Sequence, residues 1–101
     1  MIIYEITATV RADLIASYEK YMREKHIPEL LETGFFVGAK FARADENRYR
    51  IQYEAHDQTA LDEYLKTDAI RLREDFLAHF GEGIELKREN WEVLQIFESD
   101  L

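Results

Sequence analysis

The sequence contains no cysteine, one proline and only four glycines in 101 residues. The absence of cysteine excludes disulfides, thiolate nucleophiles, zinc ribbons and cysteine-bound iron–sulfur clusters, so packing alone must hold the chain together. Basic residues are also few, because 13 lysines and arginines stand against 21 acidic residues and give a formal net charge of −8. A nucleic-acid partner is therefore not expected, since affinity for phosphates comes from clustered lysine and arginine.

Long apolar runs are missing as well. No stretch approaches the length of a membrane span, and the first five residues contain Glu5 but no basic residue, unlike a signal peptide. We therefore expect a cytoplasmic protein that does not associate with membranes. The hydrophobic share of 47% and the aromatic share of 13% are typical of globular proteins. The length predicts one domain over residues 1–97, followed by a C-terminal tail at 98–101 that frays.

Two periodicities divide the chain into six segments. Alternating apolar and polar side chains predict four strands, and apolar side chains at helical spacing predict two helices. In chain order the predicted elements cover residues 2–10, 14–31, 35–44, 48–55, 61–80 and 86–97. We expect Asp13 to cap the first helix and Pro28 to bend or stop it near Ile27. The second helix is expected to have Asp57 or Thr59 as its cap and a break near Asp68.

The order strand, helix, strand, strand, helix, strand predicts an α+β fold of the ferredoxin-like βαββαβ type. Such a chain forms a four-stranded antiparallel sheet with both helices on one face. Right-handed crossovers place the first strand between the third and the fourth. The other face of the sheet is then free of helices.

The helix-free face mixes apolar, aromatic and charged side chains. A contiguous exposed aromatic patch usually marks a partner, and the two-fold dimer is the commonest assembly, so we expect a homodimer whose sheets pack face to face. Glu5 and Arg50 are expected to pair on neighbouring strands, and Trp91 to anchor the interface. The alternative is a monomer with scattered surface aromatics. The interface candidates are Glu5, Phe36, Arg50, Gln52, Trp91, Val93 and Phe97.

Tyrosines gather on the faces that should meet between sheet and helices. A core that needs only volume can use phenylalanine or leucine, whereas a buried tyrosine hydroxyl must find a partner, so the cluster predicts a partly polar ligand pocket. Alternatively, these hydroxyls reach the surface past the helix edges. His26 is the candidate acid or base at the pocket rim, because its charge changes near neutral pH, or it simply hydrogen-bonds at a helix end. The pocket candidates are Tyr4, Tyr18, Tyr21, His26, Tyr49 and Tyr53.

No metal site is expected from His26, His56 and His79, which lack the local spacing that metal ligands share. No cofactor is expected either. Whether the chain catalyses a reaction stays open at the level of the sequence, because no nucleophile or phosphate-binding motif stands out.

Several short segments resemble a small bacterial family labelled as a domain of unknown function. They are Tyr18-Glu19-Lys20-Tyr21-Met22, His26-Ile27-Pro28-Glu29-Leu30-Leu31, Gly34-Phe35-Phe36, Tyr49-Arg50-Ile51-Gln52-Tyr53, Arg71-Leu72-Arg73 and Arg88-Glu89-Asn90-Trp91. In outline the whole chain is similar to the ferredoxin-like, dimeric α/β-barrel superfamily that includes the antibiotic-biosynthesis monooxygenases.

The resemblance implies a pocket between sheet and helices, which members use for cofactor-independent oxygenation, haem breakdown, isomerisation or binding alone. The oxygenases carry an asparagine on the first strand and a tryptophan on an interior strand, a pair that this chain does not reproduce, because its only tryptophan, Trp91, is on the last strand. Haem-degrading members carry an axial histidine on the second helix, and His79 lies near the end of the second helix predicted here. Fold alone does not choose among these activities.

Three hypotheses follow. The first is a homodimeric small-molecule-binding protein of the dimeric α/β-barrel type. The second is a cofactor-independent monooxygenase or isomerase that uses His26 and the pocket tyrosines for proton transfer. The third is a structural or protein-interaction subunit, which predicts a filled core and a large exposed patch.

Overall fold

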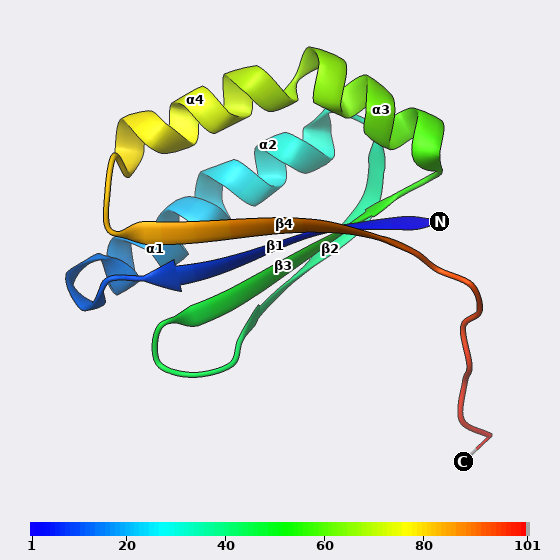
Figure 1. The fold of residues 1–101 in the computed structure, drawn as a ribbon, viewed down its shortest axis with the longest axis horizontal. Helices are drawn as coiled ribbons and strands as arrows, with labels where there is room; N and C mark the ends of the chain where they lie inside the picture. The colour runs from blue at the N-terminus through cyan, green and yellow to red at the C-terminus, as the bar shows by residue number, and fades with distance from the viewer. Residues whose placement is uncertain (101) are drawn as a thin grey trace.

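The computed structural model of the chain describes residues 1–100; Leu101, the last residue of the predicted tail, lies outside the described residues. The elements follow the predicted order (Figure 1). In chain order they are β1 (Ile2–Val10), η1 (Ala12–Leu14), α1 (Ile15–Tyr21), η2 (Met22–His26), α2 (Ile27–Glu32), β2 (Phe36–Arg43), β3 (Arg48–Ala55), α3 (Gln58–Thr67), α4 (Ala69–His79) and β4 (Ile84–Glu92).

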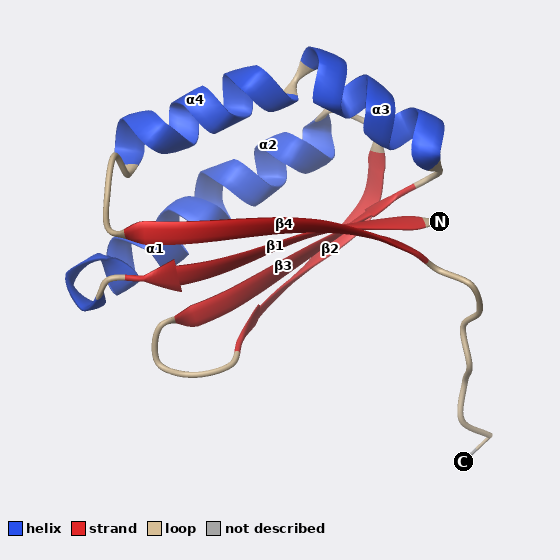
Figure 2. Cartoon of the chain, in the orientation of Figure 1, coloured by secondary structure: helices blue, strands red, loops and turns tan. Residues whose placement is uncertain are grey.

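The four strands form one sheet in the order β2-β3-β1-β4, and each neighbouring pair is antiparallel. All helices cover one face of this sheet and leave the other face bare (Figure 2). The fold is therefore the predicted ferredoxin-like α+β sandwich, with the first strand between the third and the fourth. The core lies between the sheet and the helices.

Burial along the elements follows the predicted periodicities. On β3, Tyr49, Ile51, Tyr53 and Ala55 are buried while the residues between them are not. The stripe predicted on the second helical segment is buried too, with Leu61 and Leu72 at 0% exposure. That segment breaks at Asp68 as expected, and its cap is Asp57, whose Oδ1 accepts a hydrogen bond of 2.8 Å from the Ala60 amide.

The first helical segment differs from the prediction. Asp13 does not cap it; its carboxylate pairs with Arg11 instead, at 2.6 Å between Nε and Oδ1. Nor does the helix stop at Ile27, because a π-helical stretch, η2, joins α1 to α2 without a break. Pro28 lacks the amide that would bond back into the preceding turn, and a widened turn accommodates that loss. The stretch ends at His26, which is buried.

On β2 the interface candidate Phe36 lies on the other side of the sheet from the one predicted. The register shifts between Phe36 and Gly38, which leaves Val37 as an extra residue in a β-bulge. Because one inserted residue reverses the side to which its neighbour points, Phe36 lies in the core at 6% exposure and Val37 is exposed. The prediction of Phe36 as an interface residue is therefore wrong. Its ring lies 5.0 Å from Tyr64 and 5.5 Å from Tyr53, centroid to centroid.

The last strand is shorter than predicted. It ends at Glu92, where its partner strand β1 runs out at Ile2, and only the Val93 amide adds one more bond, to the Met1 carbonyl. Leu94 and Ile96 lie beyond the end of β4 and are 89% and 68% exposed, because no strand lies beside them. The chain after β4 runs away from the sheet (Figure 1).

Candidate functional site

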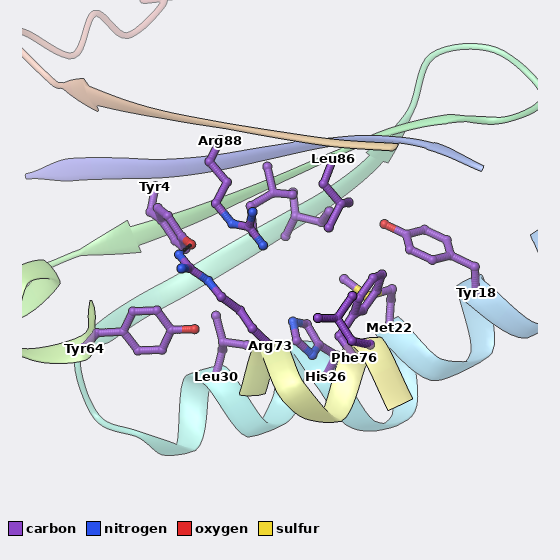
Figure 3. A pocket seen from close by; sticks show the side chains of 13 residues that line it. Tyr4, Tyr18, Met22, His26, Leu30, Tyr64, Arg73, Phe76, Leu86 and Arg88 are labelled. Carbon is purple, nitrogen blue, oxygen red and sulfur yellow. Dashed lines mark hydrogen bonds between the residues drawn. The ribbon is translucent and has the colours of Figure 1, made fainter. Parts of the chain in front are cut away.

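A cavity of about 230 Å³ lies between the sheet and the helices, open on one side. The strands β1, β3 and β4 form its floor, and side chains from α1 through α4 form its walls (Figure 3). Most of the wall is apolar or aromatic, with a few polar groups that point inward. The lining residues are Tyr4, Ile6, Tyr18, Met22, His26, Leu30, Ile51, Tyr64, Arg73, Phe76, Leu77, Leu86 and Arg88.

The predicted pocket tyrosines do meet between sheet and helices, and each is at most 7% exposed. Tyr4 and Tyr18 line the cavity; Tyr21, Tyr49 and Tyr53 do not. Tyr21 and Tyr49 instead turn their hydroxyls to carboxylates at the helix edges.

Those two hydroxyls are fully used. Tyr21 donates to Asp75 Oδ2 and Tyr49 to Glu19 Oε2, each at 2.6 Å. These hydrogen bonds hold the pKa values of Asp75 and Glu19 below the usual carboxyl range; for Asp75 the bond from Lys25 has the largest effect. Tyr21 and Tyr49 therefore join the helices to their neighbours and are not available to a ligand.

Two other tyrosine hydroxyls, those of Tyr18 and Tyr53, are buried without a partner in the part of the chain that the structure describes. Burial raises the pKa of both phenols, so both stay protonated at neutral pH. Tyr18 lines the cavity and points its hydroxyl into it (Figure 3). It is therefore a free donor for a ligand, whereas Tyr53 is enclosed in the core.

His26 lines the cavity where η2 ends, at 7% exposure. Its Nδ1 lies 3.5 Å from the Tyr21 hydroxyl, whose proton goes to Asp75. The Tyr21 oxygen therefore accepts from Nδ1–H, which leaves Nε2 of the neutral ring as an acceptor. Burial lowers the pKa of His26 to about 4; Asp75 opposes this shift and the charges of Lys25 and Arg88 add to it. His26 is thus neutral at pH 7.

Three polar lining residues were not predicted as pocket residues, namely Tyr64, Arg73 and Arg88. Tyr64 follows Leu61 by one helical turn, and Arg73 directly follows the buried Leu72. Arg88 alternates with Leu86 on the core side of β4. The signal was present in each case as a polar residue at or next to an inward position, but arginine is by default assigned to solvent.

The open face of the sheet has its own polar cluster. Glu5 is only 7% exposed, although it points away from the helices, because three donors surround its carboxylate. These are Gln52 Nε2 at 3.0 Å, Arg50 Nε at 3.3 Å and Trp91 Nε1 at 3.4 Å. The predicted pairing of Glu5 with Arg50 is confirmed.

The remaining interface candidates are not all on the sheet. Trp91 is 51% exposed on the open face, while Val93 and Phe97 follow the end of β4, with Phe97 at 82% exposure. Hydrophobic side chains are thus exposed both on the open face and on the segment that leaves it.

The residues present do not fit a haem. His79 does not line the cavity, and its Nδ1 lies 2.9 Å from the Asp75 carbonyl oxygen. The cavity is also smaller than the roughly 300–1,000 Å³ of typical ligand pockets.

Within residues 1–100, no group of three His, Asp or Glu side chains is placed to hold a metal ion. None of the helices in this part of the chain combines the length and the apolar character that a membrane span requires.

Solved structures share this fold over nearly the whole chain. A variant of SnoaB, a cofactor-independent oxygenase from Streptomyces nogalater, matches with a TM-score of 0.75 at 12% identity, over 97% of this chain and 98% of that one. The heme-degrader MhuD from Mycobacterium tuberculosis, with two hemes bound in its active site, matches with a TM-score of 0.71 at 16% identity, over 97% and 100%.

A dimeric ferredoxin-like protein from an uncultured marine organism matches with a TM-score of 0.68 at 14% identity, over 95% and 97%. At such identities the likeness establishes the fold alone. No curated protein matches the chain. A family model does match, over residues 1–94, and the chain therefore belongs to the family described as a domain of unknown function, DUF4286.

Proposed function

We propose that the protein is a homodimer that binds a small organic molecule in the cavity between its sheet and its helices. The observation that carries this proposal is the set of buried polar groups in the cavity wall that have no partner within residues 1–100, above all the Tyr18 hydroxyl and Arg73 Nε. Buried donors are normally satisfied, and each exception calls for an explanation. A bound molecule with acceptor atoms supplies one.

The size and lining of the cavity favour a compact ligand. Apolar side chains such as Met22, Leu30 and Phe76 suit a hydrophobic body, and the few inward donors fix its orientation. The cavity also counts against the interaction-subunit hypothesis, which predicts a filled core.

The open face of the sheet supports the proposed homodimer. Trp91 stands half-exposed over Glu5, and the hydrophobic side chains of Leu94, Ile96 and Phe97 have no cover in the single chain. A fold neighbour is described as dimeric. Light scattering after size exclusion should give about 24 kDa, twice the 12.0 kDa of one chain. A 12 kDa species at micromolar concentration would contradict the dimer, and a larger mixed assembly would favour the interaction subunit.

Ligand binding is tested with a pair of variants on α4. Leu77 lines the mouth of the cavity and is 59% exposed, so Leu77→Trp should obstruct the cavity without overpacking the core. Ile70→Trp, at 61% exposure on the same helix but outside the cavity, is the matched control.

Thermal unfolding is followed with benzoate, phenylacetate, hexanoate and the amide of each acid. We expect at least one compound to raise the midpoint saturably in the wild type and in Ile70→Trp, and not in Leu77→Trp. The proposed ligand binding in the cavity is refuted if no compound raises the midpoint of thermal unfolding, or if Leu77→Trp responds like the wild type.

A second candidate function, proton abstraction as in an isomerase or a cofactor-independent oxygenase, is favoured by the placement of His26. Its neutral ring lines the cavity, and its Nδ1–H is directed to Tyr21 and on to Asp75. A conjugate-acid pKa of about 4 makes it a weak base, which ranks this role second. The test is exchange of the carbon-bound protons of phenylpyruvate with D₂O. Exchange that His26→Gln abolishes would support the role, and equal exchange in both proteins would exclude it.

A further inference from the structure

The chain has eight arginines, and six of them are paired with a carboxylate. The two without such a pair in the described part of the chain are Arg73 and Arg88, and both line the cavity. A sequence with 21 acidic residues offers many partners. That the unpaired guanidinium groups are the two in the cavity therefore points to the cavity itself as the reason.

Arg73 and Arg88 approach the cavity from opposite sides. Arg73 extends from α4 and Arg88 from β4, and both side chains point into the cavity (Figure 3). Arg73 Nη2 donates to the Tyr4 hydroxyl at 3.0 Å, while its Nε is buried without an acceptor. Both positive charges also act on the Tyr64 hydroxyl, where they oppose the burial that raises its pKa.

Two like charges that face one cavity repel each other, and a buried donor without an acceptor is unfavourable. A negatively charged group between them removes both penalties at once. Arginine suits this role, because its planar fork of donors matches the two oxygens of a carboxylate.

We propose that the ligand of the cavity is a small carboxylic acid whose carboxylate lies between Arg73 and Arg88 and whose apolar body lies against Met22, Leu30 and Phe76. This assignment rests on the proposed binding function and names its ligand class. The Tyr64 hydroxyl, which points toward the same space, is a further donor to the carboxylate (Figure 3). The hydrophobic floor from Ile6 and Ile51 excludes a ligand that is polar throughout.

The experiment measures affinity by titration calorimetry at pH 7.5 for benzoate, phenylacetate, hexanoate and their neutral amides. Each acid should bind about ten-fold or more tightly than its amide, since a charge-assisted contact is stronger than a neutral one. Arg73→Gln and Arg88→Gln should each weaken the acids by about ten-fold or more and leave the amides unchanged.

Arg71→Gln is the matched control. Arg71 lies on the same helix but pairs with Asp68 outside the cavity, so this variant should bind like the wild type. Circular dichroism and the thermal midpoint confirm that each variant is folded. If Arg73→Gln alone fails to fold, Arg88→Gln still decides, because Arg88 is an exposed residue and its replacement should not disturb the core.

The outcomes separate the two proposals. Equal binding of acids and amides would overturn the carboxylate assignment and leave the pocket intact. Binding of no compound would overturn both the pocket and its ligand class. Inorganic phosphate is measured in the same way. If it binds more tightly than every acid, and if Arg73→Gln and Arg88→Gln weaken that binding, the ligand carries a phosphoryl group and the carboxylate proposal is overturned.

Discussion

On the open face of the sheet, the buried carboxylate of Glu5 has three donors within 3.4 Å, whereas under the helices a buried nitrogen of Arg73 has no acceptor within residues 1–100. The first arrangement is satisfied by the chain itself and therefore serves structure or assembly. The second is left incomplete by a chain rich in carboxylates. The contrast teaches that unsatisfied groups, more than buried polar groups as such, mark where a ligand belongs.

The largest expected effect concerns His26 on the helix-covered side. The pKa of His26 is about 4 in the folded state against the ordinary histidine value of 6.5, so the unfolded chain takes up the proton first as the pH falls. The free energy of unfolding therefore has its full contribution from the neutral His26 above about pH 6.5. That contribution falls by about 3 kcal/mol as the pH is lowered to about 4. Urea unfolding of His26→Gln should lack this part of the pH dependence. His56→Gln, at an exposed position, should keep the wild-type profile; identical profiles for all three proteins would refute the burial of a neutral His26.

Trp91→Ala tests whether the open face is covered by a second copy. Trp91 is half-exposed in the single chain, and an aromatic anchor at an interface centre contributes about 2 kcal/mol or more, or roughly a 30-fold change in the dissociation constant. Analytical ultracentrifugation should show this weakening for Trp91→Ala and none for Ile70→Ala on the outside of α4. Unchanged association of Trp91→Ala would place the interface elsewhere.

Glu5→Gln tests whether the open-face cluster is structurally complete. The glutamine side chain keeps the shape of Glu5 but lacks the negative charge that Arg50 faces. The free energy of unfolding should therefore fall by about 1.5 kcal/mol. The measurement is urea unfolding at one fixed protein concentration, because a dimer couples stability to concentration. Glu85→Gln, on the exposed edge strand β4, is the control. A variant as stable as the wild type would show that the cluster contributes nothing.

Arg73→Met should change the free energy of unfolding in the opposite direction from Glu5→Gln. Replacement of an unpaired, partly buried charge by an apolar side chain should raise the stability of the ligand-free protein by about 1 kcal/mol. Arg71→Met should change it by about 0.5 kcal/mol or less, because an exposed pair contributes little. A clear loss of stability in Arg73→Met would mean that Arg73 serves the fold and not a ligand.

The sequence predicted the sheet and its strand order because burial alternates along the whole of β3, and along β1 except at the buried Glu5. It failed at Phe36, where a single inserted residue reverses the face, and nothing in the local composition except Gly38 marks the bulge. It failed at the end of β4 because the length of a strand depends on its partner, which ends at Ile2.

The candidate site was predicted in part. Tyr4, Tyr18 and His26 line the cavity, since tyrosines on facing elements must converge in the core. Tyr21 and Tyr49 were indistinguishable from them in sequence, because the position of a carboxylate from another element decides where a hydroxyl turns. The unpaired state of Arg73 and Arg88 could not be predicted either, because pairing is a property of three-dimensional distances.

The most direct test of the account is a crystal structure of the wild-type protein grown with benzoate. It should show the carboxylate within hydrogen-bond distance of both guanidinium groups, with the ring against Phe76. A cavity filled by protein side chains, or Arg73 and Arg88 both paired with acidic side chains of the protein, would contradict it.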